Sequence, residues 1–245
     1  MAKMKMKAQA NRFLLSYMWW VLEPLLFVGL FYVIFGYILQ RGGEGYFQFL
    51  IVGKMTFMWF SKGITMGANS LVQNKGIIGQ SSVPKWVFPI VNVQEATYRT
   101  AISFVIMILC VIYNFEGNYI TWLQIIPISV MLYWFIVVLS MLLSVFVAVA
   151  EDVTQMISLL MMGMLFSSGI FWDINSIQKS GVSDLIFNVN PLALNIDLYR
   201  SVLIGGDIID YSRFLPSLII NLSLTVVVYL VFKKGNNKIT RFLFS

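Results

Sequence analysis

Histidine is absent from this chain of 245 residues, and cysteine occurs only once. The lack of histidine excludes imidazole-based general acid–base catalysis, the Ser-His-Asp arrangement and metal sites built on histidine. The single cysteine, Cys110, excludes an intrachain disulfide bond and a cysteine metal cluster. We therefore expect neither catalytic residues nor a metal site in this chain.

A nucleotide-binding signature is also missing. The chain contains no GxxxxGK[ST] pattern, so it cannot bind ATP through a P-loop, and we expect no cofactor bound to it. The 11 acidic residues are scattered, without a spacing that suggests acid–base chemistry. A membrane enzyme that uses Asp or Glu is kept as an alternative.

Charged residues are scarce. They make up 11% of the chain, against about 25% in soluble domains, whereas 59% of the residues are hydrophobic. This composition predicts an all-α integral membrane protein with a single membrane domain, residues 1–245. The net charge of +6 does not indicate a nucleic-acid partner, because the basic residues concentrate where membrane topology accounts for them.

Six apolar runs are long enough to cross a membrane as helices. The predicted spans are residues 19–39, 46–72, 91–113, 122–150, 153–171 and 214–232. Residues 1–18 precede the first span and carry four basic residues. This segment is either an amphipathic helix lying on the inner leaflet or a charged tail that only sets the orientation.

The distribution of basic residues predicts the orientation. Ten of the 17 Lys and Arg residues fall in the N-terminal segment, the 73–90 loop and the C-terminal segment, and four fall in the opposite loops. Because short cytoplasmic loops retain positive charge, both termini should lie in the cytoplasm. The basic start leads into a full-length span without a small-residue cleavage site, so no cleavable signal peptide is evident. We predict a multi-pass membrane protein.

A polar segment, VQNKGIIGQSSVPKWVFPIVN at 72–92, separates the second and third predicted spans. Its glycine and proline residues prevent one continuous helix, while its apolar residues suit a short helix lying against a neighbour. Lys75 and Lys85 place it in the cytoplasm. The segment is either a simple connection or a docking surface for a cytosolic partner.

Several charges lie inside the predicted spans, where they are costly unless they meet a partner, water or a headgroup. Lys54 and Lys62 are eight residues apart and therefore lie near one face of a helix. Glu95 and Arg99 have the spacing of an internal helix ion pair. Glu23, beside the first span, either snorkels to the interface or pairs within the protein.

The region 172–213 is too polar to be a span yet too apolar to be a plain loop. Asn190 and Pro191 predict the start of a helix, and Gly205 with Gly206 predicts its end. These limits enclose about 15 residues, or roughly 22 Å, which is short of a bilayer core of about 30 Å. We predict re-entrant outer helices; an amphipathic pair flat on the outer surface is the alternative.

Aromatic residues are abundant, at 16% of the chain, and many lie within the predicted spans. Aromatic faces suit the CH faces of sugars and acyl chains. Ordinary packing against lipid accounts for most of them.

Four stretches together resemble the permease subunits of ABC transporters that export O-antigen, capsule or teichoic-acid polymers. They are RFLLSYMWWVLEPLL at 12–26, NKGIIGQSSVPKWVFP at 74–89, the pair Glu151-Asp152, and SGIFW at 168–172 followed by NPLALNIDLYRSVL at 190–203. Each motif alone is weak, but their order and spacing extend over nearly the whole chain.

The resemblance implies a homodimer of this six-span subunit with two copies of a separate ABC ATPase, which would hold ATP and Mg²⁺. It implies a lipid-linked polysaccharide substrate and a location in the bacterial inner (plasma) membrane, surrounded by membrane lipid. We expect the ATPase to contact a coupling helix at Asn74, Lys75, Gly76, Ile77, Ile78 and Gly79. We expect the gate or the translocation path to involve Glu95, Arg99, Trp172, Asp197, Tyr199 and Arg200.

On this interpretation the chain is a transport subunit and not an enzyme. Two other classes remain as alternatives. An integral-membrane enzyme of polysaccharide assembly would act without an ATPase, and a flippase would use an ion gradient. The absence of an internal inverted repeat counts against the flippase.

Overall fold

The computed structural model describes residues 16–38, 43, 45–80, 83–113, 115, 117–177 and 181–244. Every regular element in this part of the chain is helical, which confirms the all-α prediction there. Residues 1–15 of the predicted interfacial segment lie outside the described residues. Residues 16–18 begin the first helix instead.

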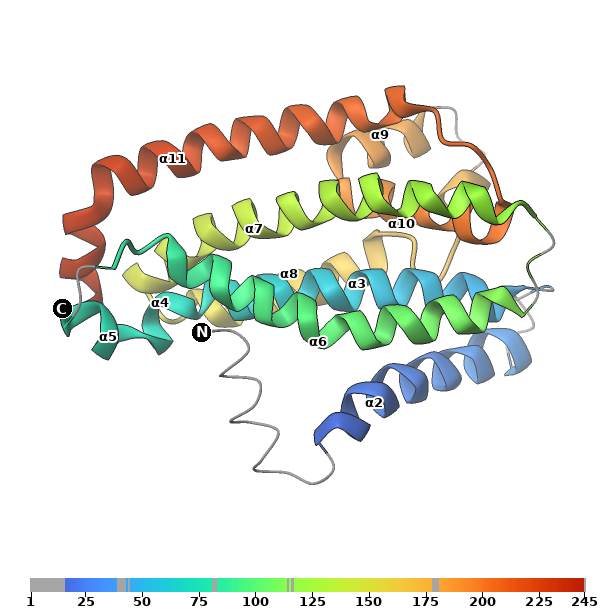
Figure 1. The fold of residues 1–245 in the computed structure, drawn as a ribbon, viewed down its shortest axis with the longest axis horizontal. Coiled ribbons are helices and arrows are strands. Elements are labelled where there is room, and N and C mark those ends of the chain that lie inside the picture. The colour runs from blue at the N-terminus through green and yellow to red at the C-terminus, as the bar shows by residue number, and fades with distance from the viewer. Residues whose placement is uncertain are drawn as a thin grey trace.

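The long elements are α2 (Ser16–Phe31) with its π-helical continuation η1 (Tyr32–Ile38), α3 (Tyr46–Ala68), α6 (Val87–Ile112), α7 (Ile125–Val149), α8 (Val153–Ser167) and α11 (Leu215–Phe244). The short elements are α4 (Ser70–Gln73), α5 (Lys75–Gln80), η2 (Tyr119–Gln124), η3 (Ile174–Ser176), α9 (Val182–Val189), α10 (Pro191–Arg200), η4 (Ser201–Gly205) and η5 (Tyr211–Phe214). Figure 1 shows α3, α6, α7 and α11 running along the long axis. We call the end that holds α4, α5 and the C-terminus the α5 end, and the end near α10 the α10 end.

Within the described residues, three helical stretches are long and apolar enough to cross a membrane: Val87–Ile112, Tyr119–Val149 and Tyr211–Gly235. Leu22–Ile38 and Val153–Ser167 are apolar but shorter. Several helix ends differ from the predicted limits, and α11 continues to Phe244 rather than ending at residue 232. Helix α6 begins at Val87 rather than at residue 91, and α8 ends at Ser167 rather than at residue 171. The early end of α8 has a local cause, because Gly169 adopts a left-handed φ of 69° that interrupts the helix.

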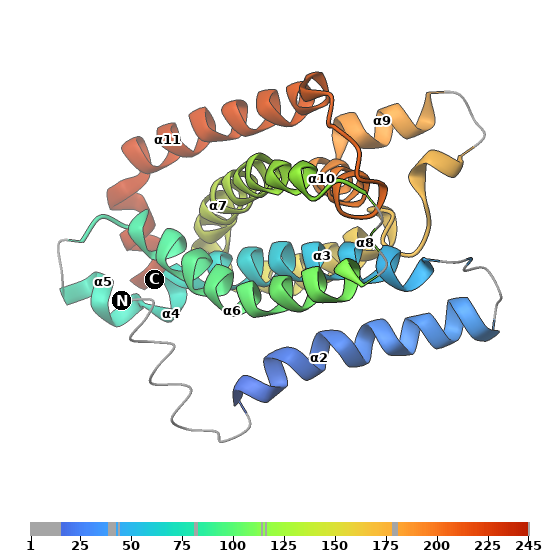
Figure 2. The same ribbon diagram turned by 45° about the vertical axis from the view of Figure 1, so that its right-hand side comes forward.

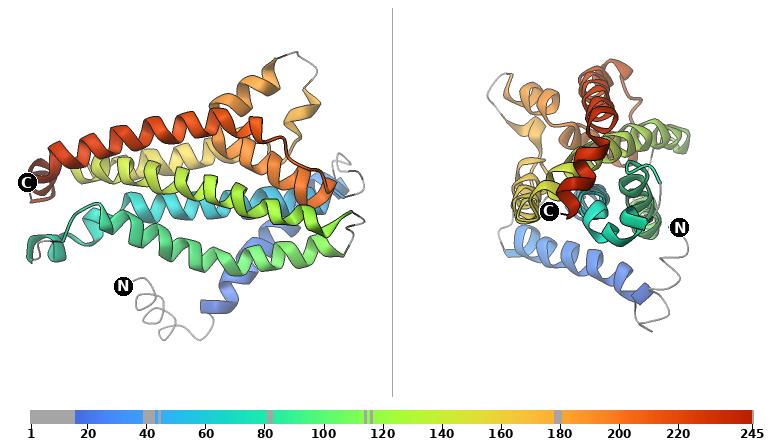
Figure 3. Two further views of the ribbon diagram at one scale, coloured as in Figure 1. Left: turned by 45° about the horizontal axis from the view of Figure 1, so that its top comes forward. Right: turned by 90° about the vertical axis from the view of Figure 1, so that its left-hand side faces the viewer.

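Helix α3 lies at the centre of the bundle (Figure 2). It contacts α2, α6, α7, α8 and α10, and most of its side chains are buried. Because protein rather than lipid surrounds it, α3 can carry lysines and glycines within an otherwise apolar sequence. Figure 3 shows the same arrangement along the bundle and from one end.

Close packing between α3 and α7 depends on two glycines one helical turn apart. A Cβ at Gly63 would lie 2.5 Å from a side-chain carbon of Ile136, and one at Gly67 would lie 2.5 Å from Cβ of Ser140. Small residues spaced in this way let two helix backbones approach closely, a common arrangement of membrane helices. Larger side chains here would push α7 away from the central helix.

A second, smaller apolar cluster stabilises the α5 end. Its buried members come from α4 to α7 and from the end of α11: Leu71, Ile78, Phe88, Ala148, Ile239 and Leu243. The last turns of α11 bend toward α5 (Figure 1). The short helix α5 is therefore fixed to the bundle by its one buried residue, Ile78.

Candidate functional site

The helical stretch formed by α10 and η4 begins and ends where the sequence predicts. The Asn190 side chain accepts hydrogen bonds from the backbone N–H groups of Leu192 at 3.1 Å and Ala193 at 3.2 Å, and Pro191 occupies the first turn. The π-helical turn η4 extends the helix to Gly205, and Gly206 closes it with a φ of 70°. These signals are local, so the sequence alone was sufficient to predict both limits.

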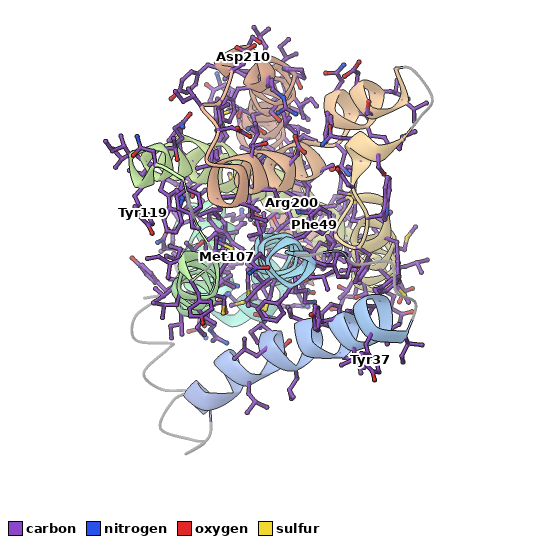
Figure 4. All side chains as sticks on the ribbon, turned by 90° about the vertical axis from the view of Figure 1, so that its right-hand side faces the viewer. Tyr37, Phe49, Met107, Tyr119, Arg200 and Asp210 are labelled. Atoms are coloured by element: carbon purple, nitrogen blue, oxygen red, sulfur yellow. The ribbon has the colours of Figure 1, made fainter. Side chains whose placement is uncertain are left out.

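Arg200 lies partly buried at the end of α10 and donates hydrogen bonds to three backbone carbonyl groups. Its Nε and Nη2 donate to the Phe49 carbonyl at 3.2 and 3.1 Å. Its Nη1 donates to the Gly169 carbonyl at 2.7 Å, and Nη2 also donates to the Ile170 carbonyl at 3.0 Å. The guanidinium carbon lies 3.3 Å from the centre of the Phe49 ring. Figure 4 labels both residues in a view from the α10 end. We call Arg200, Phe49, Gly169 and Ile170 the Arg200 cluster.

The Arg200 cluster joins α10 to α3 and to the segment after α8. Gly53 makes this possible, because a Cβ there would lie only 2.6 Å from Arg200 Nη2. The Gly169 and Ile170 carbonyls lie beyond the last residue of α8, where carbonyls have lost their helical partners. Arg200 therefore donates hydrogen bonds to the free carbonyl groups that follow α8, and the same guanidinium attaches α10 to α3.

Asp197, one turn before Arg200, has different partners. Its carboxylate accepts from Arg213 Nη2 at 2.6 Å and from Asn175 Nδ2 at 2.8 Å. The family resemblance predicts that Asp197 and Arg200 both belong to the gate or the translocation path. The structure brings the two residues to the same end of the bundle. They bind separate groups, however, because Asp197 faces η3 and η5 while Arg200 faces α3.

Tyr199 and Trp172, also predicted for the gate, occupy different environments. Tyr199 is fully buried, and its Oη lies 2.6 Å from Ser129 Oγ. Trp172 is 38% exposed and donates from Nε1 to the Phe166 carbonyl at 3.0 Å. Trp172 helps to line a cavity of about 510 Å³ at the α10 end, together with Tyr46, Phe49, Phe171 and Asp173. Trp172 is therefore accessible to a molecule in that cavity, whereas Tyr199 packs in the core.

The short helices η3, before α9, and η5, after η4, each begin with an aspartate cap. Asp173 accepts a hydrogen bond from the backbone N–H of Asn175 at 2.9 Å. Asp210 accepts from the backbone N–H of Ser212 at 2.9 Å and from its hydroxyl at 2.8 Å, and these bonds lower the pKa of Asp210. Both carboxylates therefore have a structural role in shaping the connections.

A row of aromatic rings joins α2 and η1 to the end of α8. Phe31 lies 4.4 Å from Phe27 and 6.0 Å from Phe35, measured between ring centres. The Phe171 ring lies 4.5 Å from Phe31 and 5.6 Å from Phe35, and Phe166 is 5.5 Å from Phe171. We call these five residues the aromatic row. It continues to the Trp172 cavity through Phe171, which belongs to both.

The two lysines within α3 both face α2. Lys62 Nζ lies 3.0 Å from Glu23 Oε2, and Lys54 Nζ lies 3.4 Å from the centre of the Phe27 ring. Of the two alternatives for Glu23, the structure shows pairing. The sequence indicated that both lysines needed partners, but only the packing of α2 on α3 shows which ones.

Glu95 and Arg99 form the predicted ion pair along α6. The Glu95 side chain is 4% exposed and that of Arg99 is 19% exposed. Since the two partners share one helix, this pair follows from local spacing. Its part in a translocation path remains a prediction.

The predicted coupling residues divide into a buried and an exposed set. Asn74 is buried, and its Nδ2 donates to the Ser70 carbonyl at 2.6 Å. The backbone carbonyl of Asn74 accepts hydrogen bonds from the N–H groups of Ile77 and Ile78 at the start of α5. Ile78 is buried as well, whereas Lys75, Gly76, Ile77 and Gly79 are exposed. Helix α5 thus presents a small exposed surface. The buried residues Asn74 and Ile78 hold that surface in place on the bundle.

The partners that hold these residues in place could not be predicted from the sequence. Nothing in the sequence indicated the carbonyl groups around Arg200, the position of Arg213 beside Asp197, or the role of Gly53. The only indication in the sequence was Arg200 itself, because a charged residue near the end of an apolar helix needs a partner. In the part of the chain that the structure describes, no Cys, Asp or Glu side chains gather as metal ligands would.

Comparisons with known proteins agree with the resemblance noted from the sequence, although no protein-family model matches the chain. Over 231 residues, the chain is 27% identical to the O-antigen export system permease protein RfbA of Klebsiella pneumoniae. That match covers 94% of this chain and 88% of the relative. A second Klebsiella pneumoniae protein of the same name is 26% identical over the same length, and one from Myxococcus xanthus is 20% identical over 200 residues, 81% of this chain and 76% of the relative. These relatives confirm the resemblance to permeases of O-antigen export.

Proposed function

We propose that this chain, similar to O-antigen export permeases along 94% of its length, is the membrane channel subunit of an ATP-driven polysaccharide exporter. Its substrate would be a lipid-linked surface polymer of O-antigen, capsule or teichoic-acid type, moved outward across the inner membrane. The near full-length similarity carries this proposal. A relative's function transfers best when the match covers the whole membrane domain rather than one motif.

The helices support a six-span arrangement with both termini in the cytoplasm. The five stretches that are apolar by composition account for five spans, and the central helix α3 supplies the sixth. In this orientation the α5 end faces the cytoplasm and the α10 end faces outward. The basic residues Lys233, Lys234 and Arg241 at the end of α11 then lie on the cytoplasmic side, as the positive-inside rule requires.

The exposed face of α8 supports association of two copies of the chain. Met156, Leu159, Leu160, Met162 and Phe166 are each more than 50% exposed. In a homodimer this face would border the aromatic row, because Phe166 belongs to both. The polymer would then pass between the two copies, with sugar rings moving along the phenylalanine faces toward the Trp172 cavity.

The outer end of this path would be formed by α9, α10 and η4. The Arg200 cluster and the Asp197–Arg213 ion pair hold α10 at a depth where backbone must be covered by protein. Trp172 and Asp173 offer an aromatic face and a carboxylate to a sugar in the cavity. We assign the gate to this cavity and treat Tyr199 and Arg200 as residues that position α10.

The exposed surface of α5 is suited to contact a separate ATPase, two copies of which would hold ATP and Mg²⁺. Gly76 provides a sharp test, because a Cβ there meets no heavy atom of this chain within 4 Å. The space beside Gly76 is therefore open in the isolated subunit, and a loss of export in Gly76→Val reports an external contact. We expect Gly76→Val to abolish surface polysaccharide while membrane insertion stays normal.

Gly76→Ala is the matched control, because it removes the same backbone freedom with less bulk, and it should retain most export. The Gly76→Val and Gly79→Val double variant should also insert but fail to export. Co-purification with the ATPase subunit, measured for each variant, should decline in the same order as export. Normal export by Gly76→Val would contradict the coupling assignment.

The alternatives predict different results when the gene is deleted. Polymer that accumulates inside the cell indicates an export step, and polymer that is absent everywhere indicates an enzyme of assembly. Export that continues in a strain whose ATPase cannot hydrolyse ATP, but stops when the ion gradient is removed, would indicate a gradient-driven flippase. Unchanged surface polysaccharide would contradict the proposed function.

A further inference from the structure

A cavity of about 580 Å³ opens at the α5 end between the start of α6, α7 and α11. Its walls are mainly apolar: Val138 and Met141 come from α7, and Val228 and Phe232 come from α11. The volume is in the range of about 300–1,000 Å³ that is usual for small-molecule sites. The residues named for coupling and gating do not line it.

Two lysines give this apolar cavity a positive rim. Lys85 stands just before α6, and Lys233 stands on α11, where its Nζ lies 5.3 Å from the centre of the Tyr229 ring. Lys85 is only 9% exposed, and burial lowers its pKa. No Asp or Glu stands among the described residues that line the cavity. Both amines would attract an anion that enters the cavity.

The position of the cavity matches the headgroup region of a membrane. This step rests on the proposed function, which places the α5 end in the cytoplasm. Trp86 and Tyr229 on the cavity wall are 46% and 59% exposed, as aromatic residues at a membrane interface often are. Along α11, Val226, Val227 and Leu230 are exposed and apolar and would face the acyl chains.

We propose that this cavity binds an anionic phospholipid of the cytoplasmic leaflet. The phosphate would lie between Lys85 and Lys233, and an acyl chain would extend along Val138, Met141 and Val228. Basic pockets between membrane helices on the cytoplasmic side are known to bind anionic headgroups. The bound lipid would tie the segment that follows α5 to α11.

The location favours a structural lipid over the transported molecule. The aromatic row belongs to α2, η1, α8 and the segment that follows α8, whereas the cavity belongs to α7, α11 and the segment that leads into α6. Figures 1 and 2 place α2 and α11 on opposite sides of the bundle. A molecule in the cavity would therefore lie apart from the proposed path of the polymer.

The binding test uses the full chain, purified in mild detergent and titrated with phosphatidylglycerol or phosphatidylcholine during native mass spectrometry. We expect the wild type to prefer phosphatidylglycerol. Lys85→Gln and Lys233→Gln should each weaken phosphatidylglycerol binding about fivefold, which is the effect of one basic residue near an anionic surface. The double variant should weaken it about 25-fold, with phosphatidylcholine binding unchanged.

Lys234→Gln is the matched control for charge. Lys234 is exposed beside Lys233 on the same helix but does not line the cavity, so its replacement should leave phosphatidylglycerol binding within twofold of the wild type. If Lys233→Gln and Lys234→Gln weaken phosphatidylglycerol binding equally, the effect comes from overall charge, and the proposed lipid site is wrong.

A second pair of variants tests the apolar wall without changing charge. Met141→Trp fills the cavity and should reduce retention of phosphatidylglycerol. Leu230→Trp places the same side chain on α11 at a position that is 45% exposed and outside the cavity lining, and it should have no effect. Monodisperse elution and an unchanged thermal midpoint are required of every variant that is compared.

The outcomes separate this proposal from the proposed function. Equal binding of the two lipids by the wild type would overturn the lipid site, even in a chain that restores export to a deletion strain. Retention of a polyprenyl phosphate in place of phosphatidylglycerol, lost in the lysine variants, would overturn it as well. Phosphatidylglycerol binding that depends on Lys85 and Lys233 would support the site even if the chain restored no export.

Discussion

Replacing Arg200 by methionine should destabilise the protein more than any other single loss of charge near α10. The methionine keeps an unbranched apolar side chain but withdraws every hydrogen bond donated by the guanidinium. Three backbone carbonyls, those of Phe49, Gly169 and Ile170, lose a charged donor. The Gly169 and Ile170 carbonyls lie beyond the end of α8, so their loss is not compensated by a helical partner.

The size of the effect follows from these contacts. Each carbonyl that loses a charged donor costs about 1 kcal/mol or more, so the three carbonyls together cost about 3 kcal/mol. For a chain of this length, each kcal/mol lowers the thermal midpoint by about 2–4 °C. We therefore expect Arg200→Met to lower the midpoint by about 6–12 °C. Arg200→Lys should lose about half as much, because one ammonium group cannot reach all three carbonyls.

The assay is thermal unfolding of the full chain in detergent, followed by intrinsic tryptophan fluorescence. Arg241→Met is the control, because Arg241 is exposed at the far end of α11 and its replacement should shift the midpoint by less than about 2 °C. A midpoint for Arg200→Met equal to that of Arg241→Met would refute the structural role of the cluster.

Gly53 allows the same idea to be tested by a double-mutant cycle. A methyl group at this position would lie 2.6 Å from Arg200 Nη2, so Gly53→Ala should displace a guanidinium that four hydrogen bonds hold in place. Gly53→Ala should therefore lower the midpoint in the wild type but change it much less in the Arg200→Met background. Additive effects would show that the two residues are not coupled.

Three further predictions concern other contacts of the bundle, each read from the thermal midpoint. Lys62→Glu should cost about 1 kcal/mol by placing two carboxylates together, and adding Glu23→Lys should restore the midpoint; failure of the double variant to recover would argue against the pair. Asn190→Ala removes the cap of α10 and should cost about 1 kcal/mol, whereas Asn190→Asp keeps the acceptor and should cost less; equal losses would contradict the cap. Tyr199→Phe removes the hydrogen bond to Ser129 and should also cost about 1 kcal/mol, and an unchanged midpoint would show that this bond adds nothing.

The sequence by itself determined the features that depend on neighbours along the chain. The scarcity of charge predicted an apolar helical protein, and Asn190 with Pro191 predicted the start of α10. Gly206 closes the following turn, and Glu95 pairs with Arg99 one helical turn later. These features could be predicted in advance because a cap, a left-handed glycine and an i, i+4 pair each involve no more than about five consecutive residues.

Only the tertiary structure decided which distant groups meet. Arg200 binds the carbonyl of Phe49, 151 residues away, and Lys62 binds Glu23, 39 residues away. Nothing in the sequence distinguishes Gly53 from the other glycines, and only the packing shows that the Arg200 guanidinium lies against it. The sequence showed that buried charges needed partners, because an uncompensated charge is costly among apolar helices. It could not name those partners, since the choice depends on how α2, α3 and α10 pack together.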